Sequence, residues 1–470
     1  MKIAALQNNI NQNIKKIQEQ FYETPDLVIR NIGIDKNQVE CTLLYLESLT
    51  DKYTIQEHVL SPLLHCSFYE NQEPPVAVGK ILKIYSLQDI ENALLAGDSV
   101  LLVQGRPYGY QLETKGWPQR QPQDTQNELS IKGTQQSLIE TSNQNIALIR
   151  RYIPQSELII RERNIAKKQK NKLSILYIKN QIESAILQEL EVRITKIHAD
   201  LLINTGELVE WLEDSPYSPF PQFLLTERPD WIAKHLKDGR IVLILDNTSQ
   251  ALIVPMNFVG FFKSIDDYGS RWYIASFMRV LRFVAFIVSI LLPALYVAVI
   301  SFHFEVIPMR LLFSIADSRA QVPFHPILEV SMMLGSLELM REAAIRLPAP
   351  IGLTVGIVSG TIIGQAAVQA GIVSNIMIIV VGVTALASYI IPSYDMGDTV
   401  RLLRFPFIIL AACFGLIGII VGWMILVSHI INLESLGTPY GTPFSPIKFS
   451  GFKDTFLRVP LKWLHKKRNG

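Results

Sequence analysis

The chain has 470 residues, enough for two or three domains, and 49% of them are hydrophobic. Its net charge of +2 gives no indication of nucleic-acid binding, and no nucleic-acid partner is predicted. Residues before about 280 are polar and mixed, whereas the later ones are largely apolar. This division excludes a simple soluble domain and predicts an integral membrane protein with a large soluble part.

Residues 1–24 are rich in Asn, Gln and Lys and are predicted to form an N-terminal tail, as a frayed helix or disordered. They lack the apolar run of a secretory signal, so the soluble part is expected on the cytoplasmic side. The cysteines Cys41, Cys66 and Cys413 stand singly, which indicates neither a disulfide framework nor a zinc site.

Two stretches of the soluble part share one order of elements: a strand, a helix, and then two strands joined by a turn. The strands of the first copy are expected at 41–46, 100–103 and 110–112, and those of the second at 174–178, 241–245 and 251–254. We therefore predict an α/β subdomain over 25–120 and a related one over 171–265, joined by a linker and helices over 121–170. No strand is followed by a glycine-rich phosphate motif, so no cofactor is predicted.

The stretch Arg161–Lys172 is densely basic. The simplest interpretation is a solvated helix face followed by a loop. Contact with an anionic membrane leaflet or with a neighbouring subunit is the functional alternative.

The membrane domain is predicted over 266–447, followed by a basic cytoplasmic tail over 448–470. Apolar runs of suitable length predict spans at about 283–301, 351–372, 375–392 and 406–431. Arginines before the first span place its start in the cytoplasm, and four crossings return the basic tail to the same side. The segment 327–347 is predicted as an amphipathic or re-entrant helix. If it also crossed, five crossings would put the tail on the opposite side.

Four charged residues lie on this helix: Glu338, Arg341, Glu342 and Arg346. Their spacing allows Arg341 to reach Glu338 and Arg346 to reach Glu342. One interpretation places the helix at the membrane interface, with its charges among the headgroups. The other places the charges within the membrane, where they must face protein or water and mark a pathway.

A second feature follows directly, in a stretch with no charged residue between Leu347 and Tyr394. Glycines recur at every fourth position, and a polar residue follows the last of them: Gly352, Gly356, Gly360, Gly364 and Gln365. In lipid, such a ridge lets helix backbones approach closely, so it predicts an assembly surface. These nine residues, four charged, four glycines and Gln365, are the candidate pore or helix-packing positions.

No catalytic arrangement is evident. The eight histidines are dispersed, and neither H-E-x-x-H, G-x-S-x-G nor paired cysteine spacing occurs. We predict no catalytic residue, no metal site and no enzymatic activity.

Several stretches together resemble the A subunits of GerA-type spore germination receptors, over about residues 25–447. In the soluble part and at the start of the membrane domain they are Glu140–Asn143, Leu148–Arg151, Asp238–Leu245 and Asp266–Tyr268. In the membrane part they are Leu292–Ala298, Val322–Phe324, Glu338–Ala343, Ile345–Pro348, Gly352–Val368 and Gly437–Tyr440.

The resemblance implies an integral protein of the inner membrane of the endospore, with its N-terminal domain on the core side. It implies two partners, a nutrient-binding B subunit similar to amino-acid transporters and a lipoprotein C subunit. It further implies a homo-oligomer, a pentameric ring that forms a nutrient-gated cation channel and triggers germination.

Two alternatives stay open. One is a non-conducting scaffold or signalling subunit of the receptor cluster. The other is a nutrient-blind paralogue, of the stage V sporulation AF type, that amplifies ion release. The second is left open because the sequence departs from the family pattern at Gly133–Leu138, Leu245–Ser249 and Ser435–Gly437.

Overall fold

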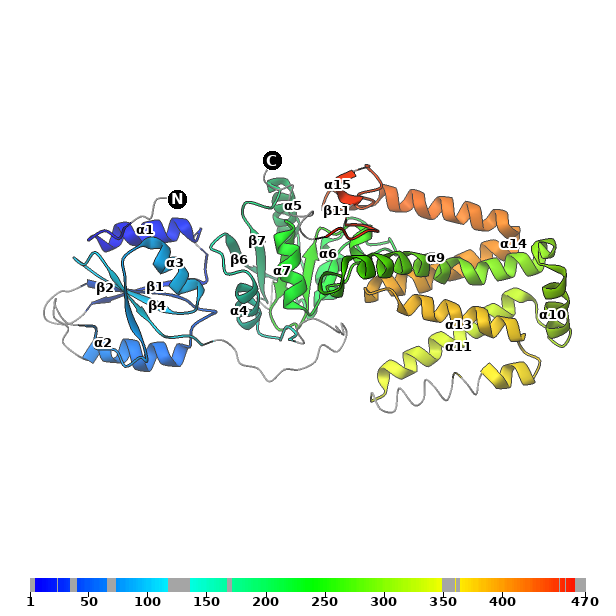
Figure 1. Ribbon diagram of the computed structural model, residues 1–470, viewed down its shortest axis with the longest axis horizontal. Coiled ribbons are helices and arrows are strands. Elements are labelled where there is room, and N and C mark those ends of the chain that lie inside the picture. The colour runs from blue at the N-terminus through cyan, green and yellow to red at the C-terminus, as the bar shows by residue number, and fades with distance from the viewer. Residues whose placement is uncertain are drawn as a thin grey trace. The chain divides into compact units, whose positions relative to one another are not determined.

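The computed structural model describes residues 5–22, 24–33, 40–65, 73–116, 136–166, 171–348, 360, 364–447, 449–452 and 454–460. The chain divides into two compact units, one with two β-sheets and one that is mainly helical (Figure 1). The first unit comprises Met1–Asp214, Phe223–Pro255 and Leu436–Thr438, and the second comprises Ser215–Gln222, Met256–Ser435 and Pro439–Gly470.

The two sheets of the first unit have the same strand order. In the first sheet it is β1-β2-β4-β5-β3, and in the second β6-β7-β9-β10-β8, with antiparallel pairing. The strands are Leu27–Gly33 (β1), Glu40–Leu46 (β2), Ile81–Ile84 (β3), Ser99–Val103 (β4), Gly109–Leu112 (β5), Leu158–Ile165 (β6), Asn171–Ile178 (β7), Leu224–Thr226 (β8), Ile241–Leu245 (β9) and Ala251–Val254 (β10). The prediction of two related α/β subdomains is therefore confirmed.

Helices cover both faces of the first sheet, as the alternating packing of the β4 side chains shows. Its residues Val100 and Leu102 pack on the side of α1 and α3, whereas Leu101 and Val103 pack on the side of η1. Successive side chains of a strand point to opposite faces, so a strand buried on both faces reads as a continuous apolar run. The helices of this unit are Ile10–Gln20 (α1), Thr54–Leu60 (η1), Ser61–His65 (α2), Leu87–Leu95 (α3), Ser142–Tyr152 (α4), Ser184–Thr195 (α5), Thr205–Leu212 (α6) and Pro229–Lys237 (α7).

The structure corrects the predicted N-terminal tail, because helix α1 is part of the first subdomain. Ile10 and Ile17 lie two turns apart on one face and are buried in the core that α3 and the first sheet also form. The side chain of Asn9 accepts a hydrogen bond from the backbone of Asn11 (3.0 Å) and caps the helix. A short but well-placed apolar stripe was thus enough to fold this segment.

The structure also corrects the interpretation of the basic segment as helix and loop. Arg161–Ile165 belong to β6, an edge strand of the second sheet. The side chains of Arg161 and Arg163 alternate along the strand on its exposed side, and charged side chains are typical of sheet edges. The second subdomain therefore begins before residue 171.

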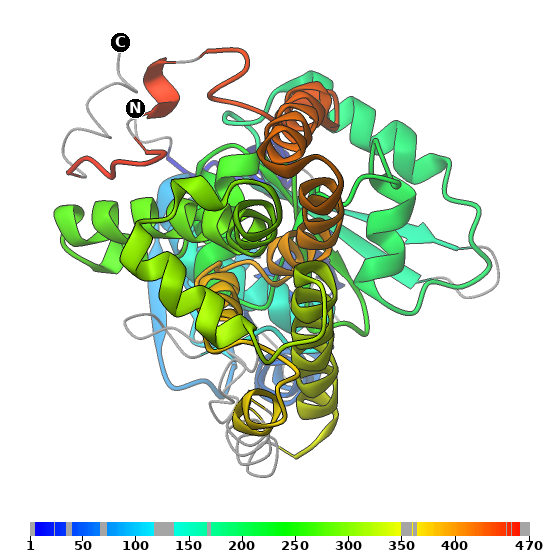
Figure 2. The same ribbon diagram turned by 90° about the vertical axis from the view of Figure 1, so that its right-hand side faces the viewer.

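The second unit is built mainly from helices, which Figure 2 shows roughly end-on. They are Phe258–Phe262 (η2), Asp266–Gly269 (α8), Trp272–Phe302 (α9), Phe304–Val306 (η3), Met309–Arg319 (α10), Pro326–Arg346 (α11), Asn375–Tyr389 (α13), Tyr394–Asn432 (α14) and Phe449–Phe452 (α15). Two short strands, Glu434–Ser435 (β11) and Thr438–Pro439 (β12), follow α14. In the described part of the chain, α9 and α14 are long and apolar enough to cross a membrane.

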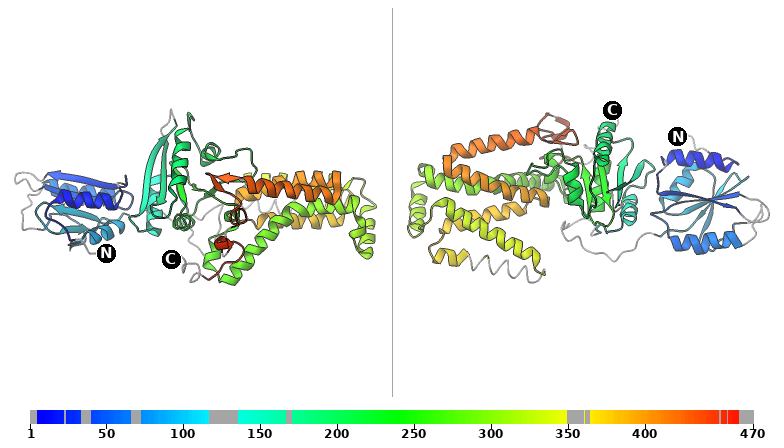
Figure 3. Two further views of the ribbon diagram at one scale, coloured as in Figure 1. Left: turned by 90° about the horizontal axis from the view of Figure 1, so that it is seen from above. Right: turned by 180° about the vertical axis from the view of Figure 1, so that it is seen from behind.

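Helix α14 is not one straight span. Its backbone leaves the helical region at Gly415 (φ 62°, ψ −141°). A Cβ atom at Gly418 would lie 2.2 Å from the carbonyl oxygen of Leu410, although eight residues of a straight helix extend about 12 Å. The chain therefore folds back, and we call residues 394–414 the first arm and 416–432 the second arm. Figure 3 shows the two arms in orange, meeting at a sharp bend.

The expected spans compare with these elements as follows. The span at 283–301 lies within α9, the helix at 327–347 corresponds to α11, and the span at 375–392 begins with α13 but ends three residues beyond it. The span at 406–431 contains the bend at Gly415 and so covers parts of both arms. Most of 351–372 lies outside the described residues, although 364–369 are helical.

Candidate functional site

The four charged residues on α11 pair along the helix as their spacing predicts. Nη2 of Arg341 lies 2.9 Å from Oε2 of Glu338, and Nη2 of Arg346 lies 2.6 Å from Oε1 of Glu342. Helix geometry alone brings such residues together. The two pairs differ in exposure: the first pair is about one-fifth exposed, whereas the side chains of Glu342 and Arg346 are 59% and 77% exposed.

The inner pair also contacts the first arm of α14. Nη1 of Arg404 lies 3.6 Å from Oε1 of Glu338, and Nη1 of Arg341 lies 3.9 Å from Oδ1 of Asp398. Asp398 in turn pairs with Arg401, one turn along the same arm. These five residues form what we call the α11–α14 charge cluster.

Arg404 is the most buried member of this cluster, with no residual exposure. Its Nη2 donates a hydrogen bond to Oγ of Ser289 (3.2 Å), near the middle of α9. Removing a guanidinium from water costs several kcal/mol unless carboxylates and acceptors surround it. The cluster has three arginines and two carboxylates, so its charges do not cancel. The cluster connects α9, α11 and α14, so Glu338 and Arg341 lie inside the helical unit, whereas Glu342 and Arg346 do not.

The glycine ridge is only partly within the described residues. Gly352 and Gly356 lie outside them. A Cβ atom on Gly360 would lie 3.7 Å from Cε of Met340 on α11, and one on Gly364 would lie 3.8 Å from Cδ1 of Ile378 on α13. These are ordinary contact distances, so the described glycines lie against neighbouring helices of the same chain. Gln365 is exposed.

A fully buried carboxylate, Glu329 on α11, was not among the predicted site residues. Its Oε1 accepts hydrogen bonds from the backbone N–H and from Oγ of Ser374, both at 2.6 Å. Its Oε2 lies 3.4 Å from Nη1 of Arg319 on α10 and 3.5 Å from the hydroxyl of Tyr296 on α9. Glu329 therefore joins three helices to the start of α13. Its place between Pro326 and an apolar stretch was the only signal in the sequence.

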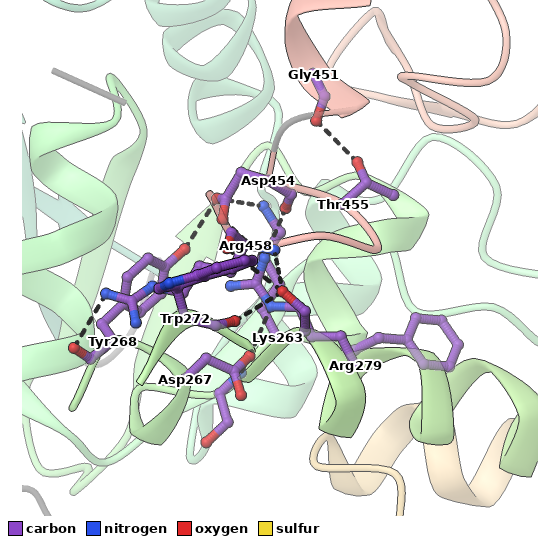
Figure 4. A network of polar contacts seen from close by, with 12 residues as sticks. Lys263, Asp267, Tyr268, Trp272, Arg279, Gly451, Asp454, Thr455 and Arg458 are labelled. Atoms are coloured by element: carbon purple, nitrogen blue, oxygen red, sulfur yellow. Dashed lines mark hydrogen bonds and ion pairs between the residues drawn. The ribbon is translucent and has the colours of Figure 1, made fainter. Parts of the chain in front are cut away.

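A second charged network lies at the beginning of α9 (Figure 4). Both Arg279 and Arg282 donate to the buried carboxylate of Asp267, at 2.9 Å. Arg279 also donates to Asp454 (2.7 Å), which pairs with Lys263 (2.9 Å). Asp267 thus ties α8 to the start of α9, and Arg279, which contacts both Asp267 and Asp454, ties α9 to the C-terminal segment.

The electrostatics of Asp454 follow from its neighbours. Burial by itself would raise the pKa of this carboxyl, but Lys263 and Arg279 outweigh that effect and lower the pKa to about 2. Asp454 is therefore ionised at any physiological pH, and the network keeps its ion pairs. Among the described residues, no group of three or more His, Cys, Asp or Glu side chains could hold a metal ion.

Residues 15–469 match the family described as Bacillus/Clostridium GerA spore germination protein. The chain belongs to the GerA family. It is 37% identical over 474 residues to the spore germination protein GerLA of Bacillus cereus, covering 98% of this chain and 96% of that protein. It is 34% identical over 467 residues to the uncharacterized membrane protein YfkQ of Bacillus subtilis, covering 98% of this chain and 92% of that protein.

A solved structure also resembles this GerA-family chain. It is the N-terminal domain of the A subunit of the Bacillus megaterium spore germinant receptor GerK3, with 25% identity and a TM-score of 0.43. The similarity covers 55% of this chain and 99% of that domain.

The family match and the similar full-length proteins confirm the resemblance found in the sequence. The GerA-family chain is an A subunit of a spore germination receptor and a membrane protein. It is not an enzyme, since GerA-family receptor subunits are not enzymes.

Proposed function

We propose that this A subunit assembles into a ring and forms a nutrient-gated cation channel whose opening triggers germination of the endospore. The observation that carries the proposal is the charged face of α11. Glu338 and Glu342 lie one turn apart on that face, each beside an arginine.

The exposure of the outer pair supports a water-filled path. Glu342 and Arg346 are exposed on a helix whose neighbouring side chains Leu339 and Ile345 are exposed and apolar. Charged side chains within a membrane are costly unless they face protein or water. That cost is removed if this face lines a water-filled path or contacts a neighbouring copy of the chain. Of the charged groups on this face, the carboxylates of Glu338 and Glu342 are the ones that would attract cations.

The same proposal includes the assembly. We infer a pentameric homo-oligomer in the inner membrane of the endospore, with the α/β subdomains on the core side. Its partners would be a nutrient-binding B subunit and a lipoprotein C subunit, as the resemblance to receptor A subunits implies. The glycines from Gly352 to Gly364 would pack helices of one chain or of adjacent copies. Native mass spectrometry of the purified receptor tests the ring size, and five copies of the A subunit are expected.

The decisive experiment measures potassium flux from liposomes that contain the purified oligomer. The variant Glu342→Gln removes an exposed carboxylate whose arginine partner stays in reach of water, so the protein should keep its stability. Its flux or cation selectivity should change. The control is Glu183→Gln on the exposed start of the soluble helix α5, which should leave flux unchanged.

Two further variants separate the contributions of charge and packing. Glu338→Gln leaves Arg404 without its carboxylate, so it should lower stability as well as flux. Gly360→Leu should disturb the packing against Met340 and reduce flux, whereas Gly382→Leu, whose Cβ meets nothing within 4 Å, should not.

The alternatives have distinct outcomes. A well-assembled oligomer that carries no flux, with or without its partner subunits, would identify a scaffold. Flux that no nutrient changes when the B and C subunits are present would identify a nutrient-blind paralogue.

A further inference from the structure

Helix α10 lies where the chain turns between two helices of the membrane unit. The apolar run of α9 ends at Phe302, and α10 begins at Met309, before α11 returns alongside α9. Figure 1 shows α10 across the end of these helices. It is too short to cross a bilayer, for which about 20 apolar residues are needed. Because α9 crosses the membrane, α10 must lie at or beyond the edge of the hydrocarbon region.

The side chains of α10 lie on four sides of the helix, one of which, opposite the side of Met309 and Phe313, carries Leu311, 50% exposed. At about 100° per residue, Leu312, Ile315 and Arg319 share the face that packs against the bundle. The exposed polar residues Arg310, Ser314 and Asp317 fall roughly opposite, at about 165° from that face.

The side of Met309 and Phe313 is apolar and exposed. Met309 and Phe313 lie at about 90° to the polar face and are 68% and 69% exposed. The residues that lead into α10 also expose apolar side chains, at Phe302, Phe304 and Val306. An apolar flank beside a polar face is typical of helices that lie in the plane of a membrane interface.

The orientation of α10 is held by specific contacts. Arg319 pairs with the fully buried Glu329 of α11, at 3.4 Å. Oγ of Ser318 accepts a hydrogen bond from the backbone N–H of Asn375 (3.1 Å), at the start of α13. The helix therefore cannot rotate freely to bury Phe313 in its own bundle.

We propose that α10 is a lipid-binding interfacial helix, with Met309 and Phe313 inserted among the acyl chains at the membrane surface. Arg310, Ser314 and Asp317 face the water and headgroups. Lipid is the occupant that the structure supports, since exposed apolar side chains recur along the chain from the end of α9, an apolar helix long enough to cross a membrane, into α10. Insertion of Met309 and Phe313 would hold the Arg319–Glu329 pair at a fixed depth in the membrane.

The test uses single cysteines in the full-length protein, reconstituted into phosphatidylcholine and phosphatidylglycerol vesicles. Its background is Cys41→Ala, Cys66→Ala and Cys413→Ser. Phe313→Cys and Ser314→Cys are each labelled with a small fluorophore and quenched by lipid-borne nitroxide or by aqueous iodide. The matched control for lipid exposure is Ile379→Cys, on the exposed apolar side of α13. The matched control for water exposure is Tyr217→Cys, in the segment Ser215–Gln222, where Tyr217 is 100% exposed.

The expected result is that the Phe313 label follows Ile379, with strong nitroxide quenching and weak iodide quenching. The Ser314 label should follow Tyr217 and show the reverse. Equal iodide access at both positions would overturn the proposal, because α10 would then lie off the membrane. Protection of the Phe313 label from both quenchers would also overturn it, since protein rather than lipid would cover the flank.

Discussion

Replacing Gly418 by alanine tests the reversal of the chain at Gly415. The new Cβ atom would lie 2.2 Å from the carbonyl oxygen of Leu410 and 2.8 Å from its carbonyl carbon. Both are backbone atoms of the first arm, and they cannot move aside by a change of rotamer. The two arms of α14 would therefore have to separate.

The magnitude follows from two opposing effects. Alanine stabilises a helix by about 0.5–1 kcal/mol relative to glycine, because it loses less backbone entropy. Overpacking of a close contact costs typically about 1–3 kcal/mol, and backbone contacts belong at the upper end of that range. Gly418→Ala should thus lower the free energy of unfolding by about 1–2 kcal/mol. At Gly382 on α13, nothing lies within 4 Å of an added Cβ atom, so Gly382→Ala should keep only the helix stabilisation by alanine.

The assay is thermal unfolding of the purified protein in detergent, followed by size-exclusion chromatography after heating. Gly418→Ala should melt below the wild type, and Gly382→Ala at the same temperature or slightly above. If the two variants melt together, the arms do not touch, and α14 is a single continuous helix.

Of three further predictions, the first two use the same measurement and the third uses limited proteolysis. Asp454→Asn should lower the free energy of unfolding by about 2 kcal/mol at pH 7, because a pKa of about 2 means that the native state favours the ionised carboxylate. In the wild type this stabilisation by the carboxylate is present above about pH 4 and is lost as the pH falls towards 2. Equal stability of the variant and the wild type at pH 7 would contradict the prediction. Glu329→Gln should lower the free energy of unfolding by about 3–5 kcal/mol, because it leaves Arg319 without its carboxylate. The double change Glu329→Leu with Arg319→Met should recover much of that stability. If it recovers none, the charges themselves are required. Arg150→Met, which leaves the buried Asp26 without its 2.7 Å partner, should speed limited proteolysis of the first unit, while Arg151→Met on the exposed side of the same helix should not.

The features that sequence predicted best are those set by neighbours along the chain. The pairs Glu338–Arg341 and Glu342–Arg346 follow from the geometry of one helix, so their spacing was sufficient. The duplicated α/β order was equally visible, because buried strands such as β4 and β9 appear as short apolar runs between turn residues.

What sequence could not give depends on packing between distant segments. Arg404 contacts Glu338 only because the first arm of α14 lies against α11, and no local pattern marks that contact. The bend at Gly415 was missed for a related reason: the residues on both sides are apolar, so hydropathy shows one long run. A single glycine with φ 62° makes the turn without any of the polar residues that usually indicate one.

The network around Asp454 has a consequence for the number of membrane crossings. Arg279 lies near the beginning of α9, and Asp454 lies after the last helix of the bundle, yet the two are in contact. A chain that leaves one side of a membrane and returns to the same side must cross it an even number of times. If α9 crosses a membrane, this contact therefore predicts an even number of crossings, and a crossing by α11 would require one more elsewhere. Two arms of α14 that each crossed, joined by the reversal at Gly415, would provide it.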